Sequence, residues 1–510
     1  ATPPVVVPPA WARAERTQEM AHVAEPSQGR SPLGEVPGGL ADRAWVDACL
    51  EKIPDRARSI VLVVPDATRA GCWSQALRLL LPAVNAWARA AHQGGTRDLT
   101  LLVAGGVHAV LARDRLLRHL LPGDAQPEKA LEGWRVIQNG DNGFRDHIPV
   151  GETGFGTPVR LHPAYVRADW KMLLGEVSYH YFAGFGGGRK LVFPGLGEPA
   201  GIAVNHRRAL RLPAGKAGED GPRLDEIEWE PACAPGRLAG NPVHLDLDEA
   251  AALARPDWVM TALEEPPTDP DPALAPSRRL RIEQGPYPGA VDRVSAGYDA
   301  VHRVCFTTAP DLLIADAGGT PRDSTFLQAH KSLQHGARFL PKGGALLLVA
   351  SCREGIGSVT LSTYAAGRGE SSPGDFRPLA GAGSDPVAAL HVQTLVAFRR
   401  AVAWARVGLW SELPAEMVAG LGMEPLADEE QALAFCRSVQ SCESTASRGS
   451  ARRPANAGAE VRTAGAASPA RPRRDGFFWG WLPRAERFLP ADGWLGGGLE
   501  GTPRPRKETA

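Results

Sequence analysis

Ile60-Val-Leu-Val-Val64 is a continuous apolar run, and the polar loop Pro65-Asp-Ala-Thr-Arg69 follows it directly. A short apolar run without alternation is typical of a strand in a parallel sheet, where both faces of the strand are buried. Apolar residues then recur at helical spacing from Trp73 to Trp87, so we predict a helix that ends by Gly94-Gly95. This stretch therefore predicts one strand, one polar loop and one helix of an α/β fold.

The same order recurs along the chain. A strand is predicted over 99–104, a tight loop at Gly105-Gly-Val-His108, and a helix after it. Further strands are predicted at 172–174, 258–261, 312–315 and 345–349. Alternating strands and helices favour mainly parallel sheets with right-handed crossovers. Asp66, Arg69 and His108 come directly after strands, and the carboxyl ends of strands are where such sheets bind ligands.

The two ends of the chain differ in composition from its centre. At 510 residues the chain can hold two ordinary domains with extensions. Residues 1–30 are predicted to be a disordered arm, and residues 441–510 a disordered tail rich in Arg, Ala, Ser, Pro and Gly. The aromatic patch 477–481 in that tail docks either on the body or on a partner. We expect truncation near residue 445 to leave folding and activity largely intact.

Composition excludes several classes of protein. The 57 basic residues balance the 57 acidic ones, so no global charge recruits nucleic acid or an anionic membrane. Seven scattered cysteines without a Cys-x-x-Cys pair argue against a disulfide framework or a structural zinc site, and for a reducing cytoplasm. The apolar runs are too short to span a bilayer, and the amino terminus lacks a signal pattern. We expect a soluble cytoplasmic protein that binds neither nucleic acid nor membrane.

The segment Tyr179-His-Tyr-Phe-Ala-Gly-Phe-Gly-Gly-Gly-Arg-Lys190, with His206 beyond it, carries candidate chemistry. Consecutive glycines let a bulky group approach the backbone, and the flanking histidine and Arg-Lys pair suit an anionic cofactor. Leu191 stands where a Walker loop has Ser or Thr, and the glycine spacing is wrong for a dinucleotide fingerprint. Taken alone, the segment fits a structural turn equally well.

Eight dispersed motifs resemble the nickel-pincer lactate racemase family, in family order and over roughly residues 30 to 440. They are Pro65-Asp-Ala-Thr-Arg69, Gly105-Gly-Val-His108, His180-Tyr-Phe-Ala-Gly-Phe-Gly-Gly-Gly-Arg-Lys190, His206, Gly240-Asn-Pro-Val-His244, Gly318-Gly-Thr-Pro-Arg-Asp323, Gln328-Ala-His-Lys331 and Cys352-Arg-Glu-Gly-Ile-Gly-Ser358. The resemblance implies two α/β domains with mainly parallel sheets and an active site in the cleft between them. We place the N-terminal domain, with the cofactor site, at 31–300, and the C-terminal domain, with substrate-binding residues, at 301–440.

The resemblance also implies a role for each matching residue. The implied cofactor is a nickel-pincer nucleotide, a pyridinium mononucleotide whose sulfur groups and ring carbon grip Ni(II). It implies that His108 and His180 are the catalytic acid and base and that His206 is the nickel ligand. The implied cofactor contacts are Asp66, Ala67, Thr68, Arg69, Pro194 and the covalently joined Lys190. The implied substrate contacts are Arg69, Gln328 and Lys331. The implied activity is racemisation or epimerisation of a 2-hydroxy acid by proton-coupled hydride transfer. Proteins that build and insert the cofactor are the expected partners besides the substrate.

The residue types suit those roles. Racemisation of a hydroxy acid removes the hydroxyl proton on one side of the substrate and returns a proton on the other side. Imidazole can act as either acid or base near neutral pH. Square-planar nickel suits sulfur and imidazole donors, and Arg69 with Lys331 can clamp a carboxylate. Val107 and Ala109 depart from the family pattern, so the substrate can differ from lactate.

Other interpretations remain open from the sequence. A non-catalytic protein that binds a nucleotide or organic acid on the same fold is the main alternative. A nicotinamide dehydrogenase is disfavoured because no strand-linked G-x-G-x-x-G is present. We interpret His244, His302, His330 and His335 as structural.

Overall fold

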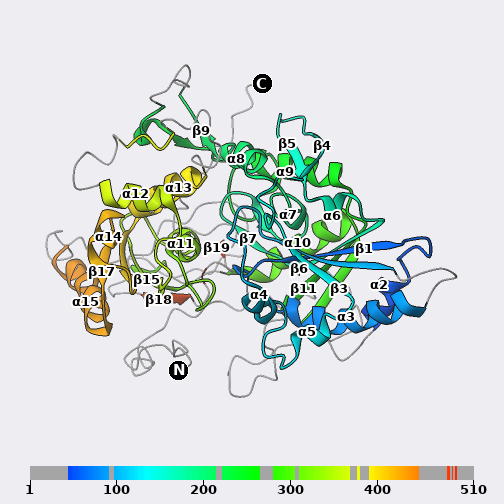
Figure 1. Cartoon of the computed structure of the whole chain (residues 1–510). Helices are drawn as coiled ribbons and strands as arrows, with labels where there is room; N and C mark the ends of the chain where they lie inside the picture. Colours follow the sequence, from blue (N-terminus) through cyan, green and yellow to red (C-terminus); the bar gives the residue numbers. More distant parts are fainter. Residues whose placement is uncertain are drawn as a thin grey trace, which may run out of the picture.

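The computed structural model describes residues 44–69, 71–90, 97–213, 221–264, 280–304, 309–367, 376–379, 390–446, 479–482, 485 and 489–490. The predicted arm over 1–30 lies outside these residues. The described part of the chain forms two α/β halves, each built around its own sheet (Figure 1). The sequence-based expectation of an α/β fold with mainly parallel sheets is confirmed.

The N-terminal half contains a six-stranded sheet in the order β12-β11-β6-β1-β2-β3. Its strands are β1 (Ser59–Pro65), β2 (Asp98–Ala104), β3 (Trp134–Gln138), β6 (Trp170–Glu176), β11 (Trp258–Glu264) and β12 (Leu280–Pro286). Five of them are parallel, and β12 pairs antiparallel to β11 at one edge. The chain adds β2 and β3 on one side of β1, and later β6 and β11 on the other. The direction in which successive strands are added therefore reverses at β1. Open parallel sheets bind ligands in the crevice beside such a reversal.

Strand β1 is buried on both faces, as its unbroken apolar sequence predicts. Ile60, Leu62 and Val64 face a core shared with α3, while Val61 and Val63 face the core on the other side of the sheet. The helices and 3₁₀ turn of this half are α2 (Ala44–Leu50), α3 (Trp73–Ala90), α4 (Arg113–Leu120), α5 (Pro127–Ala130), α6 (Pro163–Val166), α7 (Arg189–Val192), α8 (Pro199–Arg207), η1 (Leu224–Glu226), α9 (Pro242–Ala254) and α10 (Gly289–His302). Three small antiparallel pairs complete it: β4 (Ile148–Glu152) with β5 (Pro158–Leu161), β7 (Ser178–His180) with β8 (Gly184–Gly186), and β9 (Leu210–Arg211) with β10 (Glu228–Trp229).

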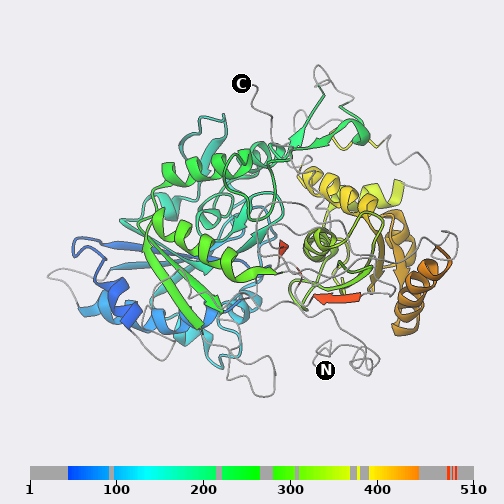
Figure 2. The same cartoon turned by 180° about the vertical axis from the view of Figure 1, so that it is seen from behind.

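The C-terminal half is a five-stranded parallel sheet in the order β17-β16-β15-β14-β18. Its strands are β14 (Leu312–Asp316), β15 (Ala345–Val349), β16 (Arg406–Trp410), β17 (Glu424–Leu426) and β18 (Trp479–Leu482). Its helices are α11 (Phe326–Gly336), η2 (Ala337–Phe339), α12 (Val359–Gly367), α13 (Val392–Trp404), α14 (Ala415–Gly420) and α15 (Glu429–Ala446). One continuous apolar cluster includes Leu173 of β6 and Leu346 of β15, so the two halves pack against each other (Figure 2).

The expectation of a disordered tail over 441–510 is wrong for two short segments. Strand β18 pairs with β14, and β19 (Leu489–Pro490) pairs with β13 (Arg303–Val304). Leu482 and Leu489 are buried. The surrounding sequence has few apolar residues, so its pattern does not predict these strands. They form because a strand that completes an existing sheet needs only a few residues of its own. Helix α15 also continues past residue 440, and the rest of the predicted tail lies outside the described residues.

Among the described helices, none combines the length and apolar character needed to cross a bilayer.

Candidate functional site

A cavity lies between the two halves, at the carboxyl ends of β1, β2 and β6. Its walls include all but one of the residues assigned to the site from the sequence: Asp66, Thr68, Arg69, His108, His180, Lys190, Pro194, His206, Gln328 and Lys331. Ala67 is the assigned residue that does not line it. The first eight come from the N-terminal half and the last two from α11 of the C-terminal half. Residues up to 265 positions apart in sequence therefore meet at one place.

Asp66 and His108 form a hydrogen-bonded pair at the ends of adjacent strands. Asp66 follows β1 and His108 follows the tight turn after β2, and their Oδ2 and Nδ1 atoms lie 2.7 Å apart. Burial opposes ionisation of Asp66, but His108, Arg69 and the Thr68 hydroxyl stabilise the carboxylate and lower its pKa to about 2. A carboxylate can only accept a hydrogen bond, so His108 donates from Nδ1 and keeps Nε2 for the cavity.

The glycine-rich segment forms the β7–β8 hairpin and then a short helix. Gly187 has φ of 78°, and a Cβ there would lie 1.8 Å from the Glu176 carbonyl oxygen, so a side chain is excluded at this position. The chain turns there into α7, which carries Lys190 to the cavity. Arg189 points elsewhere: its guanidinium lies 2.7 Å from Asp292 and donates to His244. The expectation that the Arg-Lys pair acts together toward an anion is therefore wrong, since Arg189 anchors the helix and only Lys190 lines the cavity.

Three assigned side chains surround the buried ring of Phe182. The His180 and His206 rings approach it edge-on at 4.5 and 4.9 Å between centroids, and the Lys190 Nζ atom lies 5.4 Å from its centroid. Because Phe182 is almost fully buried, it holds these three groups at one end of the cavity.

The surroundings of the same three groups disfavour their charged forms. Each has some surface open to the cavity but is removed from bulk water, and burial lowers the pKa of His180, Lys190 and His206 well below their ordinary values. Neighbouring cations add to this: Lys190 and Arg69 lower the pKa of His180, and Arg69 lowers that of Lys190. At neutral pH the two imidazoles are therefore uncharged, and Lys190 releases its proton more readily than an exposed lysine does.

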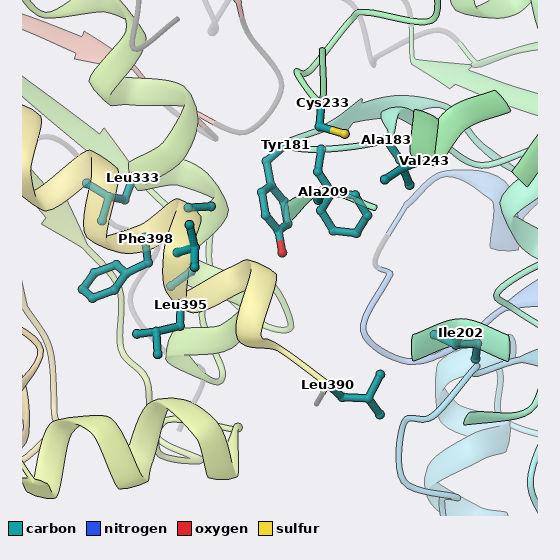
Figure 3. Close-up of a cluster of buried hydrophobic side chains, with 14 of the residues drawn as sticks. Tyr181, Ala183, Ile202, Ala209, Cys233, Val243, Leu333, Leu390, Leu395 and Phe398 are labelled. Atoms are coloured by element: carbon teal, nitrogen blue, oxygen red, sulfur yellow. The ribbon is translucent and has the colours of Figure 1, made fainter. Parts of the chain in front are cut away.

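Helices α11 and α13 form the wall on the C-terminal side. Gln328 and Lys331 lie one turn apart on α11, and the Lys331 ammonium donates to the Gln328 side-chain oxygen. Tyr181 reaches from the N-terminal half toward α13, where its hydroxyl lies 2.7 Å from that of Thr394 (Figure 3). This contact joins the two walls beside His180.

Comparison with known proteins agrees with this geometry. The family model described as the lactate racemase N-terminal domain matches residues 43–218. Lactate racemase of Thermoanaerobacterium thermosaccharolyticum is 22% identical over 60% of this chain and 63% of its own length, and lactate racemase of Lactiplantibacillus plantarum is 23% identical over 51% and 53%. Residues 43–218 are therefore similar to the N-terminal domain of lactate racemases, and the chain is similar to two lactate racemases at low identity. The matched region spans less than two thirds of either relative.

Solved structures show the same fold. The lactate racemase apoprotein from T. thermosaccharolyticum matches 88% of this chain and 92% of its own, with a TM-score of 0.61 at 17% identity. A protein from Thermotoga maritima matches 76% and 90%, with a TM-score of 0.51 at 14% identity. At these identities the likeness concerns the fold alone.

The cavity contains further histidines that the sequence analysis did not assign to the site. His330 and His335, interpreted as structural, both line it, and so does His391, which no motif indicates. His391 precedes α13 with φ of 73°, a left-handed conformation that residues with a side chain adopt at a cost and that recurs at functional sites. Burial and the nearby His108 lower the pKa of His391 to about 4. His244 and His302 lie outside the cavity lining, as a structural role requires.

The described residues of the cavity supply no complete metal-ligand set of their own. Within the described ranges, no group of three or more His, Cys, Asp or Glu side chains is arranged to hold a metal ion. His206 is a single imidazole donor, with its Nδ1 atom 3.1 Å from the Asn205 side-chain oxygen. A metal bound at His206 would need most of its ligands from a cofactor.

Proposed function

We propose that this protein is a racemase or epimerase of a 2-hydroxy acid, lactate-like or larger, which uses a nickel-pincer nucleotide bound covalently to Lys190. The observation that carries the proposal is the cavity itself, where His108, His180, Lys190 and His206 meet Gln328 and Lys331 across the two halves. The curated relatives are named lactate racemases, which supports a racemase-type activity.

The residues present fit the proposed cofactor. An uncharged amine is the form of lysine that can be acylated, and burial lowers the pKa of Lys190 and so favours that form. His206 supplies one soft-to-borderline nitrogen donor, which suits nickel when sulfur donors complete the set. Asp66, Thr68, Arg69 and Pro194 line the cavity on the same side and are assigned to hold the rest of the nucleotide. When bound, such a cofactor accepts the hydride of the substrate carbon and returns it.

His108 is assigned to take the proton of the substrate hydroxyl. Its Nδ1 atom is engaged by Asp66, so the free lone pair is on Nε2. The Asp66 carboxylate also stabilises the imidazolium that forms when Nε2 takes a proton. Asp66 thus both orients the base and favours its charged product.

The neutral His180 ring carries its proton on the other nitrogen from the one that carries it in His108. The Ala183 backbone N–H donates to its Nδ1 over 3.3 Å, so the neutral ring carries its proton on Nε2. In this state His180 donates a hydrogen bond to the substrate oxygen. This long bond contributes little, so it can be given up when Nδ1 takes a proton from solvent; the resulting imidazolium can return its Nε2 proton to the substrate oxygen and become neutral again. We assign His108 and His180 to opposite sides of the substrate.

Arg69, Gln328 and Lys331 are assigned to the substrate carboxylate and hydroxyl. An anion placed against Arg69 and Lys331 would offset the two charges that disfavour protonation of His180. Substrate binding would then raise the pKa of His180 toward the range in which it can act as an acid. The amide of Gln328 can release Lys331 and accept from the substrate instead.

The test uses protein purified from a host that makes the cofactor. We expect nickel in the protein, a mass adduct on the peptide that contains Lys190, and racemisation of at least one acid in a panel of 2-hydroxy acids resolved by chiral chromatography. Lys190→Arg keeps a long basic side chain but cannot form the adduct, so it should lose the added mass and the activity together.

The outcomes separate this proposal from its rival. An adduct on another residue, or active protein without an adduct, would remove the Lys190 assignment. Nickel-loaded wild-type protein that isomerises no acid would instead favour a non-catalytic protein that binds a nucleotide or an organic acid on the same fold.

A further inference from the structure

His206 is joined to a buried polar network that the proposed chemistry does not use. The network comprises Asn205 of α8, Asp246 of α9, Arg208, and two threonines of the β4–β5 turn. Asn205 and Asp246 both have no exposed surface. Buried polar groups destabilise a fold unless they are hydrogen-bonded, and these groups bond to one another.

The Asp246 carboxylate is held by four donors. Its Oδ2 atom accepts from the Thr157 hydroxyl at 2.6 Å, the Arg208 Nε at 2.8 Å and the Asn205 Nδ2 at 2.9 Å. Its Oδ1 atom accepts from the Thr153 hydroxyl at 2.6 Å. The carboxylate therefore cannot rotate without losing several short bonds.

This carboxylate fixes the orientation of the Asn205 amide. The Asn205 Nδ2 atom donates to Asp246 and, at 3.2 Å, to the Val243 carbonyl oxygen. Both partners are acceptors, so the nitrogen must lie on that side of the amide. The Asn205 Oδ1 atom consequently faces the Nδ1 atom of His206 at 3.1 Å.

An amide oxygen only accepts, so the neutral His206 ring must carry its proton on Nδ1. Its lone pair then lies on Nε2, the ring nitrogen left for the cavity. We infer that Asn205, held by Asp246, is a positioning residue that keeps His206 in its Nδ1–H tautomer and so presents Nε2 to a metal. The proton position follows from the Asn205 contacts, whereas the benefit to nickel rests on the proposed function. Outer partners of metal-binding histidines typically act in this way and change metal affinity by about ten- to a hundredfold.

The test reads the tautomer directly. Protein without cofactor is labelled with ¹⁵N-histidine, and two-bond ¹⁵N–¹H correlations distinguish Nδ1–H from Nε2–H rings; His206→Gln assigns the signal. We expect the Nδ1–H tautomer in the wild type and a shift toward Nε2–H in Asn205→Ala. After loading, Asn205→Ala should retain the organic adduct but lose nickel on dialysis about ten- to a hundredfold more readily.

Asn139→Ala is the matched control. Asn139 is equally buried in the same half, and its side-chain oxygen faces the Nε2 atom of His147 at 3.0 Å. This variant should lose comparable stability and alter His147, but leave the His206 signal unchanged.

A wild-type His206 ring with its proton on Nε2 would overturn the inference without any variant. So would Asn205→Ala with an unchanged tautomer, or an equal response of His206 in Asn139→Ala. Failure of the proposed function looks different: the tautomer results hold, but loaded protein isomerises no acid.

Discussion

The two walls of the cavity are built in different ways. On the N-terminal wall, side chains are held by contacts made within the fold: His108 by Asp66, and His180, Lys190 and His206 around Phe182. On the C-terminal wall, Gln328 and Lys331 bond to each other on one helix face. A side chain held in place by the fold is suited to catalysis. Two side chains that hydrogen-bond to each other can break that bond and hydrogen-bond a ligand instead, which suits them to recognition. We therefore expect substitutions on the first wall to lower kcat and those on the second to raise KM.

The largest effect should come from His108 and His180, the two histidines proposed as acid and base. Conversion in either direction needs a base on one side of the substrate and an acid on the other. His108→Ala and His180→Ala should therefore each lower kcat about a hundred- to ten-thousandfold in both directions, measured by chiral separation of products from loaded protein. Nickel and adduct content should stay near wild type.

His302→Ala serves as the control for these variants, because His302 lies outside the cavity lining and stacks on Tyr298. Its kcat should match the wild type. If either cavity variant kept full activity, or lost it in one direction only, the assignment of paired acid and base would be wrong.

The opposite wall should respond through KM. Lys331→Met keeps the length of the side chain but removes the ammonium that is assigned to the substrate carboxylate. A hydrogen bond to a charged group contributes about 1.5–3 kcal/mol, so we expect KM to rise about ten- to a hundredfold with a smaller change in kcat. Steady-state kinetics on the best substrate measure both constants.

Lys342→Met is the matched change at an exposed lysine outside the cavity lining and should leave both constants unaltered. A fall in kcat at constant KM for Lys331→Met would place Lys331 with the chemical wall and abolish the distinction between the two.

The tail contacts both halves of the molecule, and its removal should destabilise them together. Strand β18 covers the β14 edge of the C-terminal sheet, while Leu489 packs with Tyr179 and Phe185 of the N-terminal hairpin. Deleting residues 447–510 should lower the melting temperature by several degrees, because it exposes that edge and removes the buried Leu482 and Leu489, each a loss of about 2–5 kcal/mol. This corrects the expectation that truncation near residue 445 is harmless.

Deleting only residues 491–510 keeps β18 and β19, and its melting temperature in calorimetry should stay above that of the longer deletion. Equal melting temperatures for wild type and the long deletion would mean that neither tail segment contributes to stability.

The sequence predicted the strands and the N-terminal wall well, for a physical reason. Ile60–Val64 is buried on both faces, so its apolar pattern is unbroken, and the polar residues after it stand out. His391 could not be found in this way, because it reaches the cavity through a left-handed turn rather than a motif. The role of Arg189 was also misread, since its partner Asp292 lies 103 positions away and only the fold brings them together. Contacts of that kind depend on tertiary packing, which local patterns do not encode.

The smallest expected effect tests whether Lys190 really is held uncharged. Its pKa in the folded protein lies well below its ordinary value of 10.5, so between those two pH values the unfolded chain binds a proton that the folded chain does not. The free energy of unfolding must then rise with pH across that window, and Lys190 destabilises the cofactor-free protein most at low pH. Lys190→Met should therefore be more stable than wild type by on the order of 1 kcal/mol at neutral pH, with the difference shrinking as the pH approaches 10.

Thermal melts of both proteins from pH 6 to 10 measure this difference, and Lys342→Met should show no such trend. A difference that stays constant with pH would mean that Lys190 is charged in the folded state, which would remove the reason for expecting an acylated lysine on the chemical wall.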